Sequence, residues 1–307
     1  MKILIIGYGS IGERHATVLH ELGHEIHVIS QREDIPYPVC HSLNELKNLH
    51  HFEYIVISNA TPQHYTTFLH LQSEGYQGTI LIEKPIFASL PTSTMSHASS
   101  RVGYNLRFHP VIQELKNRLY QNKILCLHVY VGSYLPNWRP ARDYRLCESS
   151  SASSAEGGGV LYELSHELDY VLWLTGIWQT VSALGGHISP LEIQGTDAYA
   201  LMLQTERCPL VTIQMNYLDH QTRREIICVT ENMSMKADLV NNTLTIGQEV
   251  LSFPVQRNDT YRFMHQAILE GQESSVCSFQ EGLAILELIE KAQLSMREGK
   301  RIINGVQ

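Results

Sequence analysis

A glycine-rich turn directly after a buried-strand pattern constrains the fold of this chain more than any other feature. Residues 3–6 are aliphatic, a segment with glycines at positions 7, 9 and 12 follows, and a helical pattern then runs to residue 22. Gly7 permits a tight turn, Gly9 lets the backbone approach a pyrophosphate, and Gly12 lets the helix pack closely on the strand. The N–H groups at the start of the helix then face the phosphates. The residues predicted to hold a dinucleotide here are Gly7, Tyr8, Gly9, Ser10, Ile11 and Gly12.

Length and charge limit the class of protein. The 307 residues favour two domains, and we expect residues 1–120 to bind the dinucleotide and residues 121–307 to bind substrate and to oligomerise. A hydrophobic content of 43% is enough for two cores. The net charge of −8 argues against a general nucleic-acid or membrane-surface binder, because no broad basic field is present. No apolar run approaches the length of a membrane span.

Cysteine and histidine usage indicates a compartment. The six cysteines are scattered without a CxxC pair, and the sixteen histidines are dispersed as well. We interpret the cysteines as reduced thiols of a cytoplasmic protein and expect no metal site. The chain begins on a strand pattern and lacks the charged region, apolar core and cleavage site of a signal peptide, which also favours the cytoplasm.

The first third of the chain alternates between strand and helix patterns. After the glycine-rich turn, the expected strands are residues 25–30, 54–58, 79–82 and 102–105. The expected helices between them are residues 42–49 and 63–73. This alternation predicts an α/β domain with a doubly wound, mostly parallel Rossmann sheet.

The remainder of the chain changes to a series of strand-like runs with short connections. The expected strands are residues 124–134, 180–187, 198–204, 210–217, 224–230, 234–239, 243–246 and 249–253. Helices are expected at residues 159–174 and 281–298. The pattern predicts an α+β domain with an open, largely antiparallel sheet. Because one face of such a sheet must be covered, we expect a homodimer or homotetramer.

The end of the second strand decides which dinucleotide is preferred. Binders of NAD usually carry an acid there that accepts a hydrogen bond from the ribose 2′-hydroxyl. In this chain Ser30 and Arg32 occupy that place, and an arginine offers a two-pronged fork for a phosphate. We therefore expect NADP, with NAD as the alternative if Glu33 takes the role of the acid instead.

Polar residues also follow the third strand. They lie at the carboxyl end of the sheet, where cofactors bind in open α/β folds. Thr61 could equally be the N-cap of the next helix, with Pro62 as the first helical residue, and both roles are compatible. The cofactor-contacting residues predicted here are Asn59, Thr61, Pro62 and His64.

Two further segments place reactive side chains. Glu83 and Lys84 end the strand at residues 79–82, which puts the lysine where it would face a nicotinamide, and both are predicted to contact the cofactor. A glycine triplet at 157–159 leads into a helical pattern that carries His166 and Asp169. For Asp169 a structural role as a cap or ion-pair partner is at least as well supported as a catalytic one.

Taken together, these motifs resemble the glucose–fructose oxidoreductase / inositol dehydrogenase family (Gfo/Idh/MocA). The resemblance spans essentially the whole chain, including residues 102–110 between the two domains. It implies that Lys84 and His166 handle the substrate proton and bind a sugar while the nicotinamide exchanges the hydride. A histidine suits proton transfer because its side-chain pKa is ordinarily near neutral pH, and the positive charge of a lysine stabilises a developing alkoxide.

The chain departs from the family pattern beside the histidine. The family usually has an aspartate four residues before this histidine, and here Tyr162 occupies that position. Glu163, three residues before, is the nearest acid. Positions three and four residues apart share a helix face, so either side chain could assist His166. We therefore predict Tyr162 and Glu163 as catalytic residues, without deciding which of them replaces the family acid.

A turn-rich segment at residues 134–145 combines aromatic and basic residues. Arginine forks recognise carboxylates and phosphates, and aromatic faces stack on rings, so the segment indicates an anionic, ring-bearing substrate. The alternative is a solvent-facing loop whose arginines pair with Asp143 and Glu148. The predicted substrate-binding residues are Arg107, Tyr134, Trp138, Arg139, Arg142 and Asp143.

These observations lead to one function and two alternatives. We expect an NAD(P)-dependent oxidoreductase that acts on an anionic sugar, either nucleotide-activated or of the nonulosonate type. The segment at residues 134–140 resembles a branch of the family associated with bacterial surface polysaccharides, which implies a role in their synthesis. The alternatives are an NAD-linked polyol or inositol-type dehydrogenase, and a non-catalytic dinucleotide-sensing protein of the same fold.

Overall fold

The computed structural model describes residues 1–46, 48–92, 98–138, 143–146 and 158–305. The chain forms two compact units: the first comprises Met1–Phe108 and Gln256–Leu283, and the second His109–Val255 and the chain from Ala284 onward. This division differs in two places from the expected boundary near residue 120. Helix α3 (Pro110–Tyr120) belongs to the second unit, because its apolar side packs on the strands there. Residues 256–283 return to the first unit, which sequence patterning did not indicate.

The first unit contains a seven-stranded sheet with the order β15-β6-β5-β4-β1-β2-β3. Its strands are β1 (Lys2–Ile6), β2 (Glu25–Ile29), β3 (Val39–Cys40), β4 (Tyr54–Ile57), β5 (Thr79–Ile82), β6 (Ser100–Val102) and β15 (Cys277–Ser278). All neighbours pair in parallel except β15, which adds antiparallel to the edge at β6. The central strands β1 and β4 are buried along almost their whole length, as expected for a sheet covered on both faces. The predicted doubly wound parallel sheet is confirmed.

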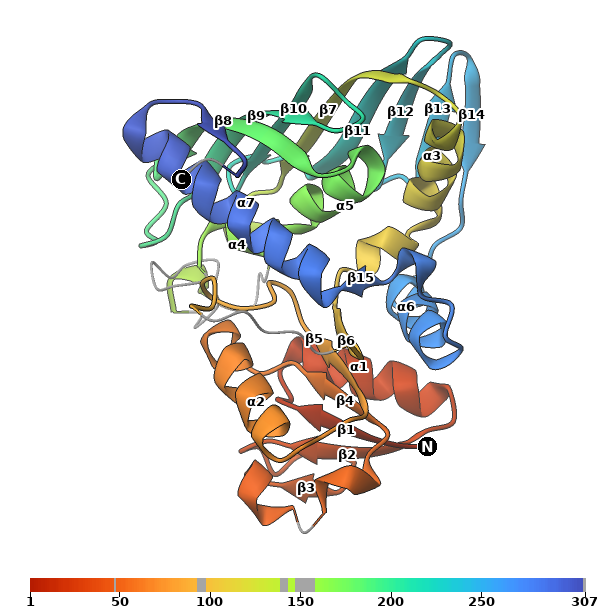
Figure 1. The fold of residues 1–307 in the computed structure, drawn as a ribbon, viewed down its shortest axis with the longest axis vertical. Coiled ribbons are helices and arrows are strands. Elements are labelled where there is room, and N and C mark those ends of the chain that lie inside the picture. The colour runs from red at the N-terminus through yellow and green to blue at the C-terminus, as the bar shows by residue number, and fades with distance from the viewer. Residues whose placement is uncertain (47, 93–97, 139–142, 147–157, 306–307) are drawn as a thin grey trace. The chain divides into compact units, whose positions relative to one another are not determined.

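Three helices accompany this sheet: α1 (Ser10–Glu21), α2 (Thr61–Ser73) and α6 (Asp259–Leu269). Because the strand order reverses between β1 and β4, right-handed crossovers place α1 and α2 on opposite faces (Figure 1). Helix α6 comes from the returning segment and packs against α1. In place of the helix expected at residues 42–49 the chain forms two short 3-10 turns, Leu43–Glu45 and Leu49–His51.

The second unit contains a nine-stranded sheet with the order β14-β13-β12-β11-β7-β10-β9-β8-β16. Its strands are β7 (Ile124–Gly132), β8 (Trp178–Gly186), β9 (Ala198–Thr205), β10 (Val211–Asn216), β11 (Arg223–Thr230), β12 (Ser234–Asp238), β13 (Thr243–Ile246), β14 (Glu249–Ser252) and β16 (Ile302–Ile303). Every pair is antiparallel except β7 with β10. The predicted open, largely antiparallel sheet is confirmed.

The helix expected at residues 159–174 is broken into α4 (Val160–Glu163) and α5 (His166–Thr175). The side chains at positions 160, 161, 162 and 164 are all buried. A straight helix buries only one stripe of its surface, so the change of direction after Glu163 allows this run to be buried. Helix α7 (Phe279–Glu298) closes the fold in the region predicted for it. Within the residues listed above, no helix is long and apolar enough to cross a membrane.

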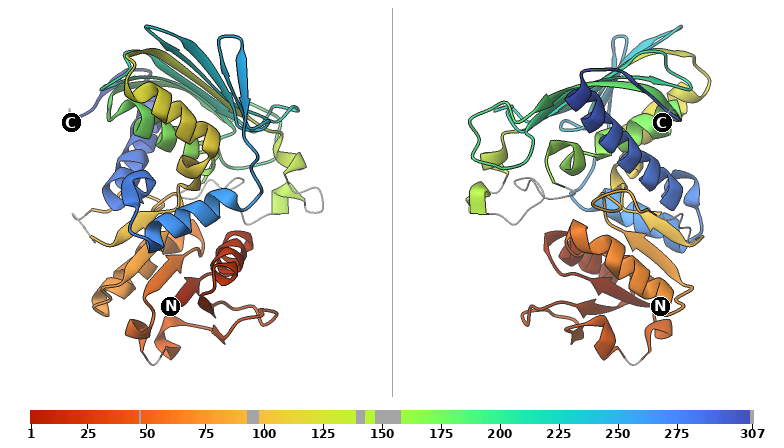
Figure 2. Two further views of the ribbon diagram at one scale, coloured as in Figure 1. Left: turned by 90° about the vertical axis from the view of Figure 1, so that its right-hand side faces the viewer. Right: turned by 60° about the vertical axis from the view of Figure 1, so that its left-hand side comes forward.

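One face of the nine-stranded sheet carries the helices of its unit, and the other carries none of those described (Figure 2). Strand β9 shows the consequence, because buried and exposed residues alternate along it. Large apolar side chains are exposed on the strands, including Leu184 on β8, Met202 on β9 and Ile227 on β11. Cross-strand pairing aligns positions 182, 202, 212, 128 and 227, which places Met202 and Ile227 on the same, helix-free face.

Candidate functional site

The predicted cofactor residues share one edge of the parallel sheet. Ile6 aligns with Ile29 on one side and with Ile57 on the other, and Ile57 aligns with Ile82. The segments that begin at residues 7, 30, 58 and 83 therefore leave the sheet side by side. This edge also includes the point between β1 and β4 where the strand order reverses, which is the usual ligand position in open α/β sheets.

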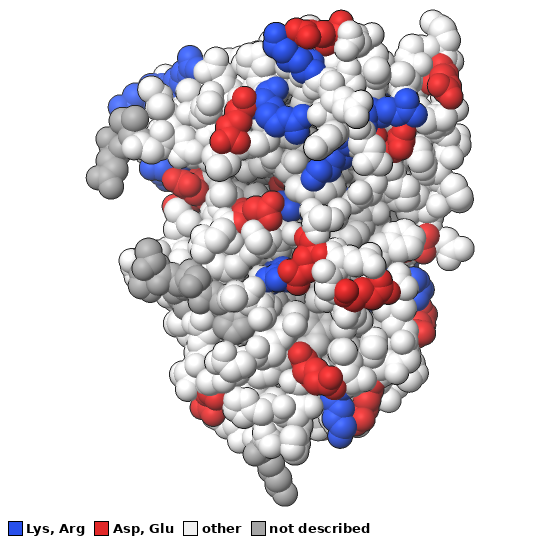
Figure 3. Space-filling model, turned by 45° about the vertical axis from the view of Figure 1, so that its right-hand side comes forward, with Lys and Arg blue, Asp and Glu red and all other residues white. Residues whose placement is uncertain are grey.

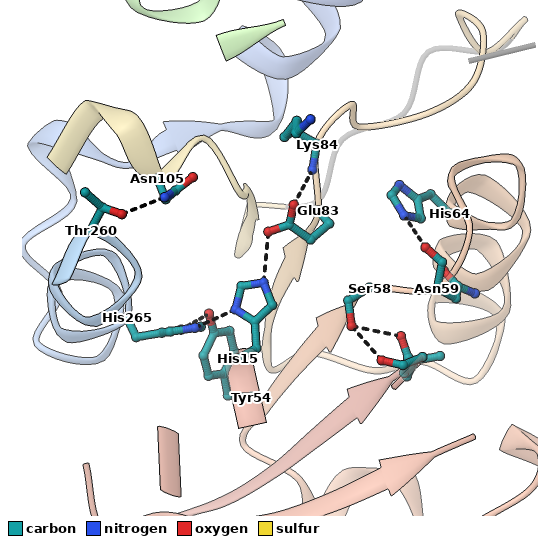
Figure 4. Close-up of polar contacts among 12 residues, drawn as sticks. His15, Tyr54, Ser58, Asn59, His64, Glu83, Lys84, Asn105, Thr260 and His265 are labelled. Carbon is teal, nitrogen blue, oxygen red and sulfur yellow. Dashed lines mark hydrogen bonds and ion pairs between the residues drawn. The ribbon is translucent and has the colours of Figure 1, made fainter. Parts of the chain in front are cut away.

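The three glycines of the turn differ in what surrounds them. A Cβ on Gly7, whose φ is +94°, would lie 2.5 Å from the backbone of Asn59, and one on Gly12 would lie 2.0 Å from the carbonyl oxygen of Gly7. A Cβ on Gly9 would meet nothing within 4 Å. Ser58 holds the turn, because its hydroxyl donates to the Gly7 carbonyl at 2.9 Å (Figure 4). Gly7 and Gly12 are thus required by packing, whereas Gly9 borders open space where a ligand would lie.

The start of α1 is suited to an anion. Its N-cap is Gly9, which supplies no side-chain cap for the first N–H groups of the helix. Such groups bind phosphate well, because the helix dipole adds to their donor capacity. The residues present therefore fit the pyrophosphate of a dinucleotide at this turn.

The arginine expected to bind a 2′-phosphate is engaged by an acid. Arg32 donates from Nε and Nη2 to the two carboxylate oxygens of Asp34, at 3.0 and 2.8 Å. The hydrogen bond from Arg32 lowers the pKa of Asp34. The guanidinium also lies 5.6 Å from the ring centre of Tyr8, and the hydroxyl of Ser30 accepts the backbone N–H of Arg32 at 3.1 Å. Two donors of the Arg32 guanidinium are therefore occupied by Asp34, a residue that sequence reasoning overlooked.

The end of β4 is tied to the segment after Lys84 by a buried histidine. His64 Nε2 lies 3.1 Å from the carbonyl oxygen of Asn59 (Figure 4). Its Nδ1 lies 3.1 Å from the carbonyl oxygen of Pro85. Burial lowers the pKa of His64. His64 therefore lies between two loops of the sheet edge, and as a neutral imidazole it donates to one of the two carbonyl oxygens at a time. The expectation that Thr61 is the N-cap is wrong, because α2 begins at Thr61 with Ala60 as its N-cap.

A second buried contact lies on the other side of Lys84. The carboxylate of Glu83 accepts the backbone N–H of Lys84 at 3.1 Å, and its other oxygen lies 2.8 Å from Nε2 of His15 (Figure 4). A Cβ on Gly103 would come within 2.5 Å of this carboxylate, so the site requires glycine there. Lys84 therefore lies between two residues, Glu83 and Pro85, that each lie within hydrogen-bond distance of an imidazole.

The contact to Glu83 continues into the interior of the first unit. His15 Nδ1 lies 2.8 Å from Nε2 of His265 on α6, whose Nδ1 lies 3.0 Å from the hydroxyl of Tyr54 on β4. Burial and the neighbouring His15 hold the pKa of His265 well below its usual value, and burial raises that of Tyr54. Sequence reasoning missed all three residues. Only His15 gave a signal, three residues beyond the last glycine of the turn.

Arg107, a predicted substrate ligand, is buried in the first unit. Its Nη1 lies 3.0 Å from Oε1 of Glu281, and the other oxygen of that carboxylate accepts the N–H and hydroxyl of Ser278 at 2.8 Å. Arg107 therefore joins the 3-10 turn Asn105–Phe108 to the start of α7. This contact gives Arg107 a structural role that the sequence did not suggest.

In the second unit the structure anchors the segment that carries the predicted histidine. His166 is the first residue of α5. Gly159, with φ +89°, precedes α4, and a Cβ there would lie 2.6 Å from the hydroxyl of Thr196. The N–H of Val160 donates to the carbonyl of Thr196 at 3.0 Å. Thr196, in the loop before β9, thus fixes where α4 begins.

The residue that follows Thr196 organises this loop. Asp197 is fully buried, and its carboxylate accepts the N–H groups of Ile188 and Ser189 at 2.9 and 3.1 Å and the Ser189 hydroxyl at 2.6 Å. Its own N–H donates to the carbonyl of Gly186 at the end of β8. Sequence reasoning missed Asp197, because its partners are two backbone N–H groups and one serine hydroxyl that no motif marks.

An ion pair fixes α5 beside His166. The fully buried Glu167 lies 2.8 Å from Nε of Arg224 on β11 and accepts the hydroxyl of Tyr170 at 3.3 Å. The Arg224 side chain is 26% exposed, so this ion pair links α5 to β11 from the edge of the interior, and removing Arg224 would leave the buried Glu167 carboxylate without it. Asp169 is also buried on α5. Tyr162 and Glu163 are the last residues of α4, and their catalytic roles stay predictions.

Aromatic residues of the predicted substrate segment have local partners. The ring of Tyr134 lies 4.1 Å from that of His220, and the ring of Trp138 meets that of Tyr217 edge-on at 5.2 Å. Trp138 also donates from Nε1 to the carbonyl of Ser133 at 3.2 Å. These contacts orient both aromatic residues, and their substrate roles stay predictions.

Of the arginines in the same segment, the structure shows the ion-pair partners of Arg145. Asp143 pairs with Arg145 at 2.7 Å, and Arg145 also contacts Glu192 at 3.3 Å. An arginine paired with Asp143 was expected if residues 134–145 form a solvent-facing loop. Glu192 is an additional partner that was not expected. Arg139, Arg142 and Glu148 lie outside the described residues. On the face shown in Figure 3, charges of both signs are interspersed over a largely uncharged surface.

No family model matches the sequence, and no characterised protein sequence is significantly similar to it. Solved structures nevertheless share the fold over the whole chain. GenD2 from gentamicin A biosynthesis, in complex with NAD, is 16% identical with a TM-score of 0.80, and the match covers 100% of this chain and 97% of GenD2. Levoglucosan dehydrogenase in complex with NADH is 12% identical with a TM-score of 0.82, covering 99% and 98%.

A third structure carries both a cofactor and a sugar. The WlbA dehydrogenase from Bordetella pertussis, in complex with NADH and UDP-GlcNAcA, is 15% identical with a TM-score of 0.77, covering 100% of this chain and 98% of WlbA. The fold of this chain is therefore the two-domain, Rossmann-type fold of these dehydrogenases. At such identities the likeness concerns the fold alone, and membership of the Gfo/Idh/MocA family stays a prediction.

Proposed function

We propose that this protein is an NAD(P)-dependent oxidoreductase that transfers hydride between a nicotinamide and a sugar. The observation that carries the proposal is the sheet edge of the first unit. There the glycine turn, with open space at Gly9, and the segment after β5 that carries Lys84 leave the same edge of the sheet on either side of the end of β4, and Glu83 accepts the backbone N–H of Lys84. The fold shared with dehydrogenases solved with NAD or NADH supports the same function.

Each residue has a defined part in this proposal. The turn at residues 7–12 and the start of α1 hold the pyrophosphate. The nicotinamide supplies the hydride donor or acceptor when the cofactor is bound. The ammonium of Lys84 stabilises negative charge on the substrate oxygen, and the imidazole of His166 exchanges the hydroxyl proton. Glu163 or Tyr162 assists His166.

We further propose that the sugar is anionic, either nucleotide-activated or of the nonulosonate type, in surface-polysaccharide synthesis. Tyr134 and Trp138, with Arg139 and Arg142, supply the stacking and charge that such a substrate requires. The fold shared with WlbA, which is solved with UDP-GlcNAcA, supports the nucleotide-activated class. The pairing of Arg145 with Asp143 lessens the local positive charge and so favours the polyol alternative.

We also propose that the protein lies in the cytoplasm, because the cysteines among the described residues are free thiols.

Fluorescence titration tests this function directly. The purified protein is titrated with NADPH and NADH, alone and with a panel of UDP-sugars, UDP-sugar acids, nonulosonates and inositols, and dinucleotide turnover is followed at the same time. Tight dinucleotide binding with turnover of one anionic sugar is the expected result. Turnover of inositol alone would establish the polyol alternative, and binding without turnover of any sugar would favour a sensing protein. Binding of neither dinucleotide would refute the proposal.

Arg32 and Asp34 should control the choice between NADP and NAD. We propose NADP as the preferred cofactor, with only modest selectivity because Asp34 competes for the fork of Arg32. Arg32→Ala should weaken NADPH binding about 10- to 100-fold and change NADH binding less than about threefold. Asp34→Asn should improve NADPH binding by up to about fivefold. Equal effects of Arg32→Ala on NADPH and NADH binding would show that Arg32 does not contact the 2′-phosphate of the cofactor.

The helix-free face of the nine-stranded sheet should join copies of the chain. We propose a homodimer or homotetramer in which Met202 and Ile227 are buried, because exposed apolar rows on a sheet favour association. Met202→Glu should shift the mass measured by light scattering toward the monomer. Tyr120→Glu, which changes an exposed aromatic residue at the end of α3, is the matched control and should leave the mass unchanged. A wild-type monomer would contradict the proposal.

A further inference from the structure

The buried contacts behind Lys84 form a continuous chain of hydrogen-bonding groups. From the interior outward, its members are the Tyr54 hydroxyl, the imidazole of His265, the imidazole of His15 and the carboxylate of Glu83, joined at 3.0, 2.8 and 2.8 Å. The last oxygen of the carboxylate accepts the N–H of Lys84. Both histidines are fully buried, and Glu83 is nearly so. The chain therefore lies in a region of low dielectric, where hydrogen bonds are strong and unpaired polar groups are costly.

With a neutral tyrosine, two neutral imidazoles and an ionised glutamate, the donors and acceptors allow one direction for this chain. A neutral imidazole carries one donor and one acceptor. If Tyr54 donates to Nδ1 of His265, then Nε2 of His265 carries the proton and donates to Nδ1 of His15. Nε2 of His15 must then carry a proton, which it donates to Glu83. Every contact is satisfied, and the only charge is the carboxylate.

The reverse direction is less favourable. With both imidazoles neutral, it requires Glu83 to take up a proton and donate to His15, and both imidazoles change tautomer. The Tyr54 hydroxyl would then accept from His265, and its own proton would lack an acceptor among the described contacts. A protonated Glu83 would also hold the N–H of Lys84 less strongly, since hydrogen bonds to an ionised acceptor are about twice as strong as neutral ones.

We propose that Tyr54, His265 and His15 are positioning residues that act through Glu83, forming a one-way hydrogen-bond chain that orients the Glu83 carboxylate and so fixes the backbone of Lys84. Helix α6 is part of this device because it supplies His265. The helix is held there by Thr260, whose hydroxyl accepts from Asn105 at 2.7 Å. The returning segment, 250 residues from His15, thereby becomes part of the candidate site. The importance of Lys84 itself rests on the proposed function.

A pair of substitutions at His265 tests the chain without cofactor or substrate. Glutamine retains one donor and one acceptor at imidazole-like spacing, whereas methionine has similar bulk and neither. The readout is hydrogen exchange of the Lys84 amide, measured at single-residue resolution in the full-length protein. The Glu83 amide, which donates to the carbonyl of Ile57 in the sheet, is the internal reference. His265→Met should speed exchange at Lys84 about tenfold, with His265→Gln close to wild type and the reference unchanged.

Two results would overturn the proposal. If both variants exchange like the wild type at Lys84, the chain does not fix that backbone. If both variants speed exchange equally at Glu83 and Lys84, His265 serves only packing. Either result leaves the proposed oxidoreductase function untouched, because that function is measured by dinucleotide binding and turnover. Conversely, the exchange experiment retains its meaning if no substrate is found.

A second pair of variants tests the direction of the chain at its inner end. Tyr54→Phe removes the terminal donor without changing the ring, and Tyr76→Phe removes another buried tyrosine hydroxyl, which donates to the carbonyl of Phe52 at 3.0 Å. The measurement is the 15N chemical shifts of the imidazoles, which report tautomers. In the wild type and Tyr76→Phe, both His15 and His265 should carry the proton on Nε2. Tyr54→Phe should change the His265 signal, and a wild type with protons on Nδ1 would refute the direction.

Discussion

Replacing Lys84 with alanine is expected to abolish turnover, with a loss of kcat of about a thousandfold or more, while NADPH affinity stays within a few-fold. The ammonium is the charge placed where negative charge develops on the substrate oxygen, and removing such a group costs about 100- to 1,000-fold in kcat, with a further loss if it also transfers a proton. Its backbone, by contrast, is held by Glu83 and is not needed for the glycine turn. The measurement is steady-state turnover of the sugar found by titration, together with NADPH fluorescence.

One further variant separates the effect of charge from that of proton transfer, and another serves as a control. Lys84→Arg keeps a positive charge that does not dissociate, so it should recover part of the electrostatic effect but no proton transfer. Lys123→Ala removes an exposed lysine that pairs with Glu231 on the second unit and should leave kcat unchanged. Survival of turnover in Lys84→Ala would remove Lys84 from the mechanism, and the sensing alternative would then gain support if the other predicted residues also proved dispensable.

The second large effect is expected at the glycine turn, where replacing Gly12 should lower stability and replacing Gly9 should weaken NADPH binding. Gly12→Ala places a Cβ 2.0 Å from the Gly7 carbonyl oxygen and should destabilise the protein by about 1–3 kcal/mol, because neither backbone can yield freely. Gly9→Ala meets no protein atom within 4 Å and should leave the melting temperature unchanged. It should nevertheless weaken NADPH binding about 5- to 150-fold, since the methyl group would occupy the place of the pyrophosphate.

Thermal unfolding and fluorescence titration of the same preparations distinguish the two effects. Gly12→Ala should lose stability and binding together, whereas Gly9→Ala should lose binding alone. If Gly9→Ala binds NADPH like the wild type, the pyrophosphate does not lie against this turn. If Gly12→Ala is as stable as the wild type, the contact between α1 and β1 is less tight than the structure indicates.

Local sequence patterns were sufficient for most of the strands and for one edge of the first sheet, but not for helices α3 and α6. Consecutive aliphatic residues mark buried parallel strands, so β1, β4 and β5 were predicted within a residue or two. The residue after each strand end could then be assigned to one edge, because carboxyl ends of parallel strands lie together. The alternation of β9 gave the open sheet in the same way. Both results depend only on periodicity within a few residues.

Contacts between distant residues could not be predicted in this way. Arg32 was correctly placed at the end of β2, but its partner Asp34 changes what the fork offers a ligand. Arg107 was expected to contact a substrate, which stays a prediction, and its pairing with Glu281, far along the chain, was not foreseen. Both arginines look alike in the sequence, since a guanidinium suits a phosphate and a carboxylate equally well. Only the folded chain shows which anion each one meets.

The sequence by itself determined the two sheets, the glycine turn and the position of Lys84 at a strand end, because these follow from short-range periodicity and backbone sterics. The tertiary structure alone decided the return of residues 256–283 to the first unit and the chain from Tyr54 through His265 and His15 to Glu83. A histidine carries no signal of its partner, since hydrogen bonds depend on positions in space. That is why the groups that hold Lys84 became visible only when strands and helices far apart in sequence were packed together.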